Sequence, residues 1–123
     1  MIGLGIDLCD IRRIENTLQK GDSFLQRFFT AAERDYLQSR GKVAGQSAAA
    51  MFAAKEAFLK AVGTGLSGGI SLREIGIVHE NSGAPRYELT GRAADKMQQL
   101  GAVSAHLSLT HDAGMAAAVC IIE

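Results

Sequence analysis

The sequence has little of what holds a small secreted protein together. It contains no tryptophan, one proline and two cysteines among 123 residues. The two cysteines, Cys9 and Cys120, do not make a disulfide framework, and their separation fits neither a zinc site nor a redox motif. A reducing compartment is the simpler expectation, and we predict a cytoplasmic protein.

Two further absences exclude broad classes of function. Thirteen Lys and Arg residues balance thirteen Asp and Glu residues, so the formal net charge is zero. A chain without excess positive charge lacks the broad footprint of a nucleic-acid-binding or membrane-surface protein. No apolar run reaches the roughly 18 residues that span a bilayer. The first ten residues, MIGLGIDLCD, have no basic region before their apolar stretch, unlike a signal peptide. We predict no nucleic-acid partner and no membrane partner.

What remains is an ordinary globular composition, with 47% hydrophobic and 21% charged residues. The length suits a single domain over residues 1–123. A chain of this size buries a limited core by itself, and association of copies would add to that core.

Periodicity and capping signals predict an α+β fold. Helices are predicted over residues 10–21, 30–41, 45–62 and 90–101. Strands are predicted over residues 2–8, 75–79, 86–89, 105–110 and 115–122, with HDAG as the last turn. Asp10 can cap the first helix, Thr30 and Glu33 form a capping box, and Thr90 can cap the last helix. Because helices dominate the first half and strands the second, we expect a small antiparallel sheet packed against the alanine-rich helix over 45–62.

The first strand has two unlike faces. Its apolar face carries Ile2, Leu4, Ile6 and Leu8. The opposite face carries only Gly3, Gly5 and Asp7. This second face is either a sheet face open to water or a place where a cation or a ligand backbone approaches the Asp7 carboxylate. The strand pattern alone leaves both interpretations open.

Glu56 and Lys60 share one face of the alanine-rich helix at i and i+4 spacing. A plain surface ion pair is the common explanation of that spacing. The surrounding segment FAAKEAFLKA is otherwise apolar, however, and charged groups beside a buried helix face need a partner or a chemical task.

Two other motifs are weaker. Gly63, Gly65 and Gly68 match G-x-G-x-x-G, but the pattern follows a helix instead of opening one, which disfavours a dinucleotide fold. The loop could still bind a phosphate through backbone N–H groups. On the strand over 105–110, His106, Ser108 and Thr110 share one face and His111 follows at the turn. A half-exposed face with paired hydroxyls explains this equally well, and no Ser-His-Asp triad is evident.

Taken together, the motifs resemble the holo-[acyl-carrier-protein] synthase family of 4′-phosphopantetheinyl transferases from end to end. The matching segments are GLGIDLCDIRRIE at 3–15, RFFTAAE at 27–33, FAAKEAFLKAVGTGL at 52–66, SGAPRYEL at 82–89 and HLSLTHDAGMAAAVCII at 106–122. The first and third contain the two diagnostic motifs of the family. Chain length and Cys9, where larger members often have an acidic residue, indicate the short, homotrimeric class.

The resemblance implies a transferase that moves the 4′-phosphopantetheine group from coenzyme A to a serine of apo-acyl carrier protein. The products are holo-acyl carrier protein and adenosine 3′,5′-bisphosphate, in support of fatty acid biosynthesis. It also implies a Mg²⁺ ion held by Asp7 and Glu56, with Glu56 and Lys60 as catalytic residues. The serine proton goes either to Glu56 or to a metal-associated water, and the sequence leaves this open.

The resemblance also assigns binding residues. Coenzyme A would be bound by Lys60, Gly63, Thr64, Gly65, Ser108, Thr110 and His111. In trimeric members the last three come from the neighbouring subunit. Arg13 would meet the acidic carrier protein. Met51 and Ala84 depart from the family, which usually has Arg and Lys there, so a ligand or carrier contact is either missing or supplied elsewhere.

Two other classes of function stay open at this point. One is a non-enzymatic module that binds a nucleotide or diphosphate through the same charged cluster. The other is a degenerate structural subunit of a synthase complex. The presence of Asp7, Glu56 and Lys60 together argues against the second, because a decayed site has no physical reason to keep all three.

Overall fold

The computed structural model describes residues 1–123, apart from the side chain of residue 66. The helices are α1 (Ile11–Gln19), α2 (Ser23–Phe28), α3 (Ala31–Gln38), α4 (Ala44–Val62) and α5 (Gly91–Gln99). The strands are β1 (Gly3–Asp10), β2 (Ile75–His79), β3 (Pro85–Leu89), β4 (Ala105–Asp112) and β5 (Met115–Ile122). Short 3₁₀ helices lie at Gly41–Val43, Leu66–Gly68 and Leu72–Glu74. The α+β class is confirmed.

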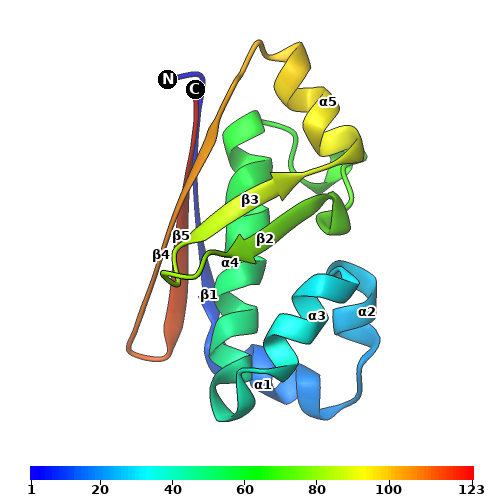
Figure 1. Ribbon diagram of the computed structural model, residues 1–123, viewed down its shortest axis with the longest axis vertical. Helices are drawn as coiled ribbons and strands as arrows, with labels where there is room; N and C mark the ends of the chain where they lie inside the picture. Colours follow the sequence, from blue (N-terminus) through cyan, green and yellow to red (C-terminus); the bar gives the residue numbers. More distant parts are fainter.

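Helix α4 is the centre of the molecule (Figure 1). One antiparallel sheet, in the order β1-β5-β4, lies along one side of it, and the β2-β3 hairpin crosses it on another. Helices α1, α2 and α3 gather near one end of α4, and α5 lies near the other. Most of the α4 side chains are buried, and many are alanines. Small side chains let the neighbouring backbones approach this helix closely.

Strand β1 makes the closest of these approaches. A Cβ atom built on Gly3 would lie 1.9 Å from the carbonyl oxygen of Ala61, and one on Gly5 would lie 1.9 Å from that of Ala57. No side chain fits at such distances, so these two glycines permit the contact. The face that bears Asp7 is therefore packed on α4, and its interpretation as a face open to water is wrong.

Gly5→Ala is expected to destabilise the fold by about 3 kcal/mol or more, because the new methyl group meets backbone on α4 that cannot move aside alone. Thermal unfolding measures the loss. Gly83→Ala is the matched control: its φ is +91° and nothing lies within 4 Å of the added Cβ, so it incurs only backbone strain of about 1–2 kcal/mol. Equal melting temperatures for Gly5→Ala and the wild type would contradict the close contact.

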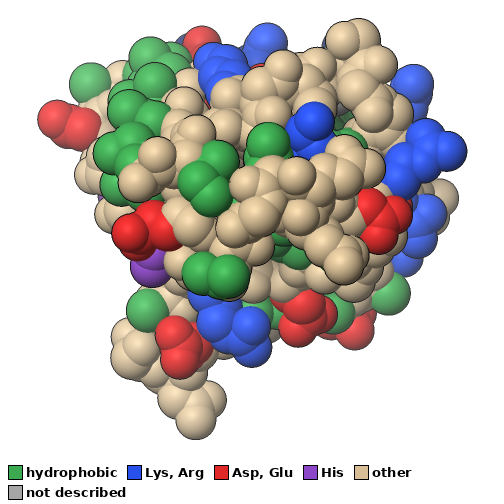
Figure 2. Space-filling view, turned by 90° about the horizontal axis from the view of Figure 1, so that it is seen from above, with side chains coloured by type: hydrophobic (Ala, Val, Ile, Leu, Met, Phe, Trp, Pro, Cys, Tyr) green, Lys and Arg blue, Asp and Glu red, His purple; other side chains and the backbone are tan. Residues whose placement is uncertain are grey.

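The apolar face of β1 points outward instead. Leu4, Ile6 and Leu8 are 57, 66 and 61% exposed, and Ile2 is 46% exposed. In Figure 2 hydrophobic side chains gather on the left, the side on which the sheet lies in Figure 1. Such a row is more than scattered surface hydrophobics and indicates an interaction surface. We call this side of the β1-β5-β4 sheet the outer face.

Several local predictions are tested directly. Asp10 caps α1 by accepting a hydrogen bond from the Arg13 amide at 3.3 Å. The capping box of Thr30 and Glu33 is present at the start of α3. Thr90 precedes α5 without a side-chain capping bond. Instead, a carboxylate oxygen of Glu74 accepts a hydrogen bond from the Arg92 amide at 2.7 Å. This satisfies a backbone N–H group in the first turn of α5 that has no partner within the helix.

Two other differences concern α2, which was not predicted, and the last turn. His111 and Asp112 still pair within the sheet, opposite Ala116 and Met115. The turn is therefore Ala113–Gly114, with φ angles of 51° and 78°, as in a two-residue hairpin. The prediction that HDAG forms the turn was too wide.

No helix among the described residues is both long and apolar enough to cross a membrane.

Candidate active site

The structure brings Asp7, Glu56 and Lys60 together where β1 passes α4. Lys60 Nζ donates to Asp7 Oδ1 at 3.0 Å and to the carbonyl oxygen of Ile6 at 3.0 Å. Strand β1 is at the edge of its sheet, so this carbonyl is on the open edge. The Asp7 side chain is 12% exposed and the Lys60 side chain 55% exposed. The lysine thus anchors on the strand while its ammonium stays within reach of solvent.

Glu56 completes the cluster one helical turn before Lys60. Burial and the neighbouring carboxylate of Asp7 raise the pKa of Glu56, while Lys60 and Arg13 oppose the shift. Two half-buried carboxylates that repel each other are costly for the apo protein. Perturbed acids of this kind concentrate at functional sites.

The cluster borders a hollow of about 340 Å³ that is otherwise apolar. Asp7 and Lys60 line it together with Ile6, Leu8 and Ala117. The last three belong to the outer face of the sheet. The charged cluster and the outer face therefore meet at the edge of β1.

The donor set can hold a small divalent cation only in part. No group of three or more His, Cys, Asp and Glu side chains suited to a metal lies together among the described residues. Asp7 and Glu56 supply two adjacent carboxylates, and a cation between them would relieve their repulsion. Mg²⁺ is commonly held by one or two carboxylates, with substrate phosphate oxygens and waters completing its shell. The residues present fit that ion.

The loop Gly63–Thr64–Gly65 follows Lys60 directly at the end of α4. Gly63 has a φ of 81° and caps the helix, its amide donating to the carbonyls of Leu59 and Lys60. Thr64 lines a hollow of about 330 Å³ with Arg92 and Lys96 of α5. The loop is therefore near the lysine end of the cluster and beside positive charge.

Ser108, Thr110 and His111 are not part of this cluster. Ser108 and Thr110 point to the outer face, away from α4, and line a hollow of about 190 Å³ that also includes Ile6 and Val119. His111 is on the opposite face of β4 and lies 3.2 Å from Gln46, in the first turn of α4. A helix of 19 residues is about 28 Å long, so His111 and the Gly63 loop lie near opposite ends of α4.

His111 lines a hollow of about 200 Å³ with residues that sequence reasoning missed, among them Arg40 and His79. The His79 ring stacks on Tyr36 at 4.1 Å between centroids, and burial with the nearby Arg40 lowers the pKa of His79. Tyr36 comes from α3, Arg40 from the turn after it and His79 from β2, and no local motif connects them with His111. Only the packing of the hairpin over α3 and α4 brings them together.

Lys55 is part of the motif FAAKEAFLKA, but the sequence analysis gave it no role. It is fully buried and forms an ion pair with Glu33 at 2.9 Å. Burial lowers the pKa of Lys55, and the Glu33 carboxylate opposes that shift. A signal was present in the sequence, because a lysine inside the apolar segment FAAKEAF must find buried partners.

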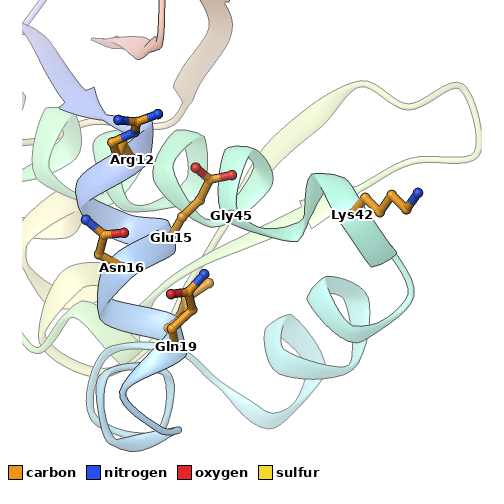
Figure 3. Close-up of a pocket in the computed structure, with 7 residues that line it drawn as sticks. Arg12, Glu15, Asn16, Gln19, Lys42 and Gly45 are labelled. Atoms are coloured by element: carbon orange, nitrogen blue, oxygen red, sulfur yellow. The ribbon is translucent and has the colours of Figure 1, made fainter.

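Arg13 and Arg12 face different surroundings on α1. Arg13 is close enough to Glu56 to act on its pKa, which places it at the rim of the charged cluster. Arg12 lines a separate polar hollow of about 560 Å³ with Glu15 and Lys42 (Figure 3). None of the predicted site residues lines this larger hollow, so size alone does not identify the site.

Met51 and Ala84, the two positions where the sequence departs from the pattern of the family it resembles, have different structural settings. Met51 is 1% exposed and belongs to the hydrophobic core. Ala84 is in the exposed turn between β2 and β3, where its carbonyl accepts from the Glu80 amide at 2.9 Å. Neither position supplies a positive charge, whereas Arg40 lines the His111 hollow.

Known proteins resemble the chain over its whole length. The model of the 4′-phosphopantetheinyl transferase superfamily matches residues 3–120. A holo-[acyl-carrier-protein] synthase of Treponema denticola is 46% identical, covering 100% of this chain and 98% of the relative. One of Trichlorobacter lovleyi is 45% identical with the same coverage. The Neisseria meningitidis enzyme superposes with a TM-score of 0.90 at 33% identity, covering 100% and 98%. The Helicobacter pylori enzyme in complex with coenzyme A gives 0.82 at 33%, covering 98% and 99%.

Proposed function

Because the chain belongs to the 4′-phosphopantetheinyl transferase superfamily, we propose that the cluster of Asp7, Glu56 and Lys60 is its catalytic centre. The chain transfers the 4′-phosphopantetheine group of coenzyme A to a serine of apo-acyl carrier protein, as its relatives over the full length do. Holo-acyl carrier protein and adenosine 3′,5′-bisphosphate are the products, and fatty acid biosynthesis depends on the former. The non-enzymatic interpretations are set aside.

One observation carries the assignment of the centre. Asp7 of β1 meets Glu56 and Lys60 of α4 at the open edge of β1, with Lys60 Nζ 3.0 Å from Asp7 Oδ1. Glycines bring β1 onto α4 closely enough for this to happen. The cluster combines acidic groups for a cation with an exposed ammonium for phosphate oxygens.

We assign a Mg²⁺ ion to Asp7 and Glu56. When bound there, the ion would neutralise charge on the diphosphate of coenzyme A. Lys60 would donate to the same phosphate oxygens, since its ammonium is more than half exposed and held on Asp7 and the Ile6 carbonyl. As the leaving group gains charge, this donor stabilises it more strongly than it stabilises bound substrate.

Glu56 is our candidate for the group that takes the serine proton. Its carboxylate belongs to the cluster itself, and a carboxylate within hydrogen-bond reach of the attacking hydroxyl can act as a general base. The serine oxygen forms a bond to the β-phosphorus as the bond between that phosphorus and the bridging oxygen breaks. The proton passes to Glu56, and adenosine 3′,5′-bisphosphate leaves with the bridging oxygen.

Coenzyme A binding requires two surfaces that one copy of the chain does not bring together. We assign Lys60 and Gly63–Thr64–Gly65 to one surface and Ser108, Thr110 and His111 to the other. Ser108 and Thr110 lie on the apolar outer face, and His111 follows Thr110 on the opposite face of β4. Ile6, also on the outer face, lines hollows that border both Lys60 and Ser108. A homotrimer in which neighbouring copies meet through this face would complete each site from two subunits. The outer face would then be buried.

Arg13→Glu is expected to raise KM for acyl carrier protein more than KM for coenzyme A. Carrier proteins of this kind are acidic, and charge reversal at the rim of the site weakens their encounter, most clearly at low salt. Steady-state kinetics at several ionic strengths measures it. Arg12→Glu changes net charge equally but lies in the separate hollow of Figure 3, so a smaller effect is expected. Equal KM values for carrier protein in wild type and Arg13→Glu would refute the contact.

The function as a whole is tested by mass spectrometry of apo-acyl carrier protein incubated with the chain, coenzyme A and Mg²⁺. We expect the gain of one phosphopantetheine and the release of adenosine 3′,5′-bisphosphate, both abolished by a chelator. An unchanged carrier-protein mass would refute the transfer.

We place this activity in the cytoplasm, since Cys9 and Cys120 are buried free thiols, as expected in a reducing compartment.

A further inference from the structure

The buried Lys55–Glu33 pair joins four segments at one point. Lys55 Nζ donates three hydrogen bonds of 2.9 Å each, to Glu33 Oε1 and to the carbonyls of Leu72 and Ile75. An ammonium has three donors, so every one is used. The acceptors lie on α3, in the 3₁₀ helix Leu72–Glu74 and at the start of β2. The donor lies on α4.

Glu33 accepts hydrogen bonds through both of its carboxylate oxygens. Its Oε1 accepts from the Thr30 amide at 2.8 Å as well as from Lys55, and its Oε2 accepts from the Ile77 amide at 2.9 Å. The side chains are 0 and 2% exposed. A capping box alone needs no such burial. Glu33 caps its own helix and also binds α4 through Lys55 and β2 through the Ile77 amide. Fully satisfied buried networks of this kind make a structure rigid.

The pair is placed where it can set the orientation of α4. Consecutive helical residues are about 100° apart, so Lys55 is about 200° around the helix from Ala57, which contacts β1. The glycines of β1 hold one side of α4, and Lys55 holds the other. Glu56 and Lys60 project between these two contacts, toward Asp7. Rotation of α4 about its axis would therefore move Glu56 and Lys60 only at the expense of the Lys55 hydrogen bonds and the close contact with β1.

We propose that Lys55 and Glu33 are positioning residues for the transfer reaction, because their buried pair fixes the rotation of α4 that aims Glu56 and Lys60 at Asp7. The inference rests on the proposed function of that cluster. Lys55 touches neither the substrate nor the reacting atoms. Its effect reaches the reaction only through the orientation of the next residue and of Lys60.

Lys55→Met tests the pair, since methionine has similar length but no charge. In the folded variant we expect kcat to fall at least tenfold, because misplacement of a catalytic group by about 1 Å can lower a rate roughly a hundredfold. KM for coenzyme A should change less than kcat, since Lys60 acts mainly on charge that develops in the transition state and Ser108, Thr110 and His111 are not on α4. Rates are normalised to the folded fraction. Met97→Ala, a buried residue on α5, loses core packing without altering the pair and should keep its kcat.

A double variant separates positioning from simple stabilisation. Lys55→Met with Glu33→Gln leaves no unpaired buried charge, so it should be more stable than Lys55→Met alone. If the pair positions α4, stability recovers while kcat stays low. If stability and kcat recover together, the pair is only structural and the proposal is overturned. A wild-type kcat in folded Lys55→Met would overturn it as well. The double variant also answers the question if the single variant does not fold.

Crystal structures of the variants give a readout that does not depend on activity. The distance from Lys60 Nζ to Asp7 Oδ1, 3.0 Å in the native chain, should lengthen and the two carboxylates should separate. An unchanged cluster in the double variant would contradict the proposal. If instead the wild-type chain transferred nothing to apo-acyl carrier protein, the proposed function would fail, and the same distances would still decide whether the pair orients α4.

Discussion

Replacing Glu56 with glutamine is expected to lower kcat by roughly a hundredfold or more, the usual loss when one group that stabilises transition-state charge is removed. Glutamine keeps the size of the side chain, so the α4 packing persists, but it cannot accept the serine proton and is a weaker ligand for Mg²⁺. The Mg²⁺ concentration for half-maximal activity should rise as well. Steady-state transfer to apo-acyl carrier protein across a Mg²⁺ series measures both effects.

The same variant should not be destabilised. Because the folded protein raises the pKa of Glu56, ionisation of that carboxyl costs stability once the pH is above its raised pKa, and glutamine removes the cost. Without Mg²⁺, the variant should melt at or above the wild-type temperature at neutral pH. The difference should vanish below the ordinary glutamate pKa of about 4.3. Loss of activity with undiminished stability would distinguish a chemical role from a structural one.

Glu88→Gln provides the control, since it makes the same chemical change at an exposed position on β3. Its kcat and Mg²⁺ dependence should match those of the wild type. If Glu56→Gln turned over at a near-native rate at low Mg²⁺, the assignment of Glu56 as ligand and base would be wrong.

Mixing two inactive variants should restore activity if each site is shared between copies. Glu56→Gln damages the surface that holds the metal, and His111→Ala damages the surface assigned to coenzyme A. Each variant alone has no intact site. After the two are unfolded and refolded together in equal amounts, an interface has an intact metal half with probability one half and an intact coenzyme half with the same probability. About a quarter of the sites should then be active in a closed symmetric assembly.

A second mixture makes this result specific. Glu56→Gln mixed with Asp7→Asn should stay inactive, because both changes affect the same half and no arrangement of copies rebuilds it. Light scattering must show particles of uniform size, and mass spectrometry must show both variants within them. Activity of the first mixture no higher than the mean of its parts, in particles proved to be mixed, would show that one subunit holds both halves.

The outer face is the surface through which neighbouring copies would share a site. Leu4, Ile6 and Leu8 are each more than half exposed, and Ser108 and Thr110 lie on the same side of the sheet. A second copy seated there would cover apolar surface and would approach Asp7 and Lys60 at the edge of β1. Burial of such a surface is the main favourable term in association.

The sequence by itself determined the family, the α+β class and the residues that converge at the site. Glu56 and Lys60 were recognisable because their i, i+4 spacing is local and their surroundings are apolar, so charged groups there required an explanation. Asp7 is distant from them in the sequence, and only the family resemblance grouped it with them. The capping box at Thr30 and the strand over 115–122 were predictable for a similar reason, since hydrogen-bonding and alternation within a few residues specify them.

Only the tertiary structure decided which face of β1 is buried. Alternation predicts two faces but not which one meets the core, and here the glycine face packs on α4 because a backbone without side chains can approach an alanine-rich helix closely. It also decided that Glu33 pairs with Lys55 and that His111 lies far from Glu56 within one chain. These relations join residues distant in sequence, and no local pattern carries them. They depend on how α3, α4 and the two sheets pack around one buried helix.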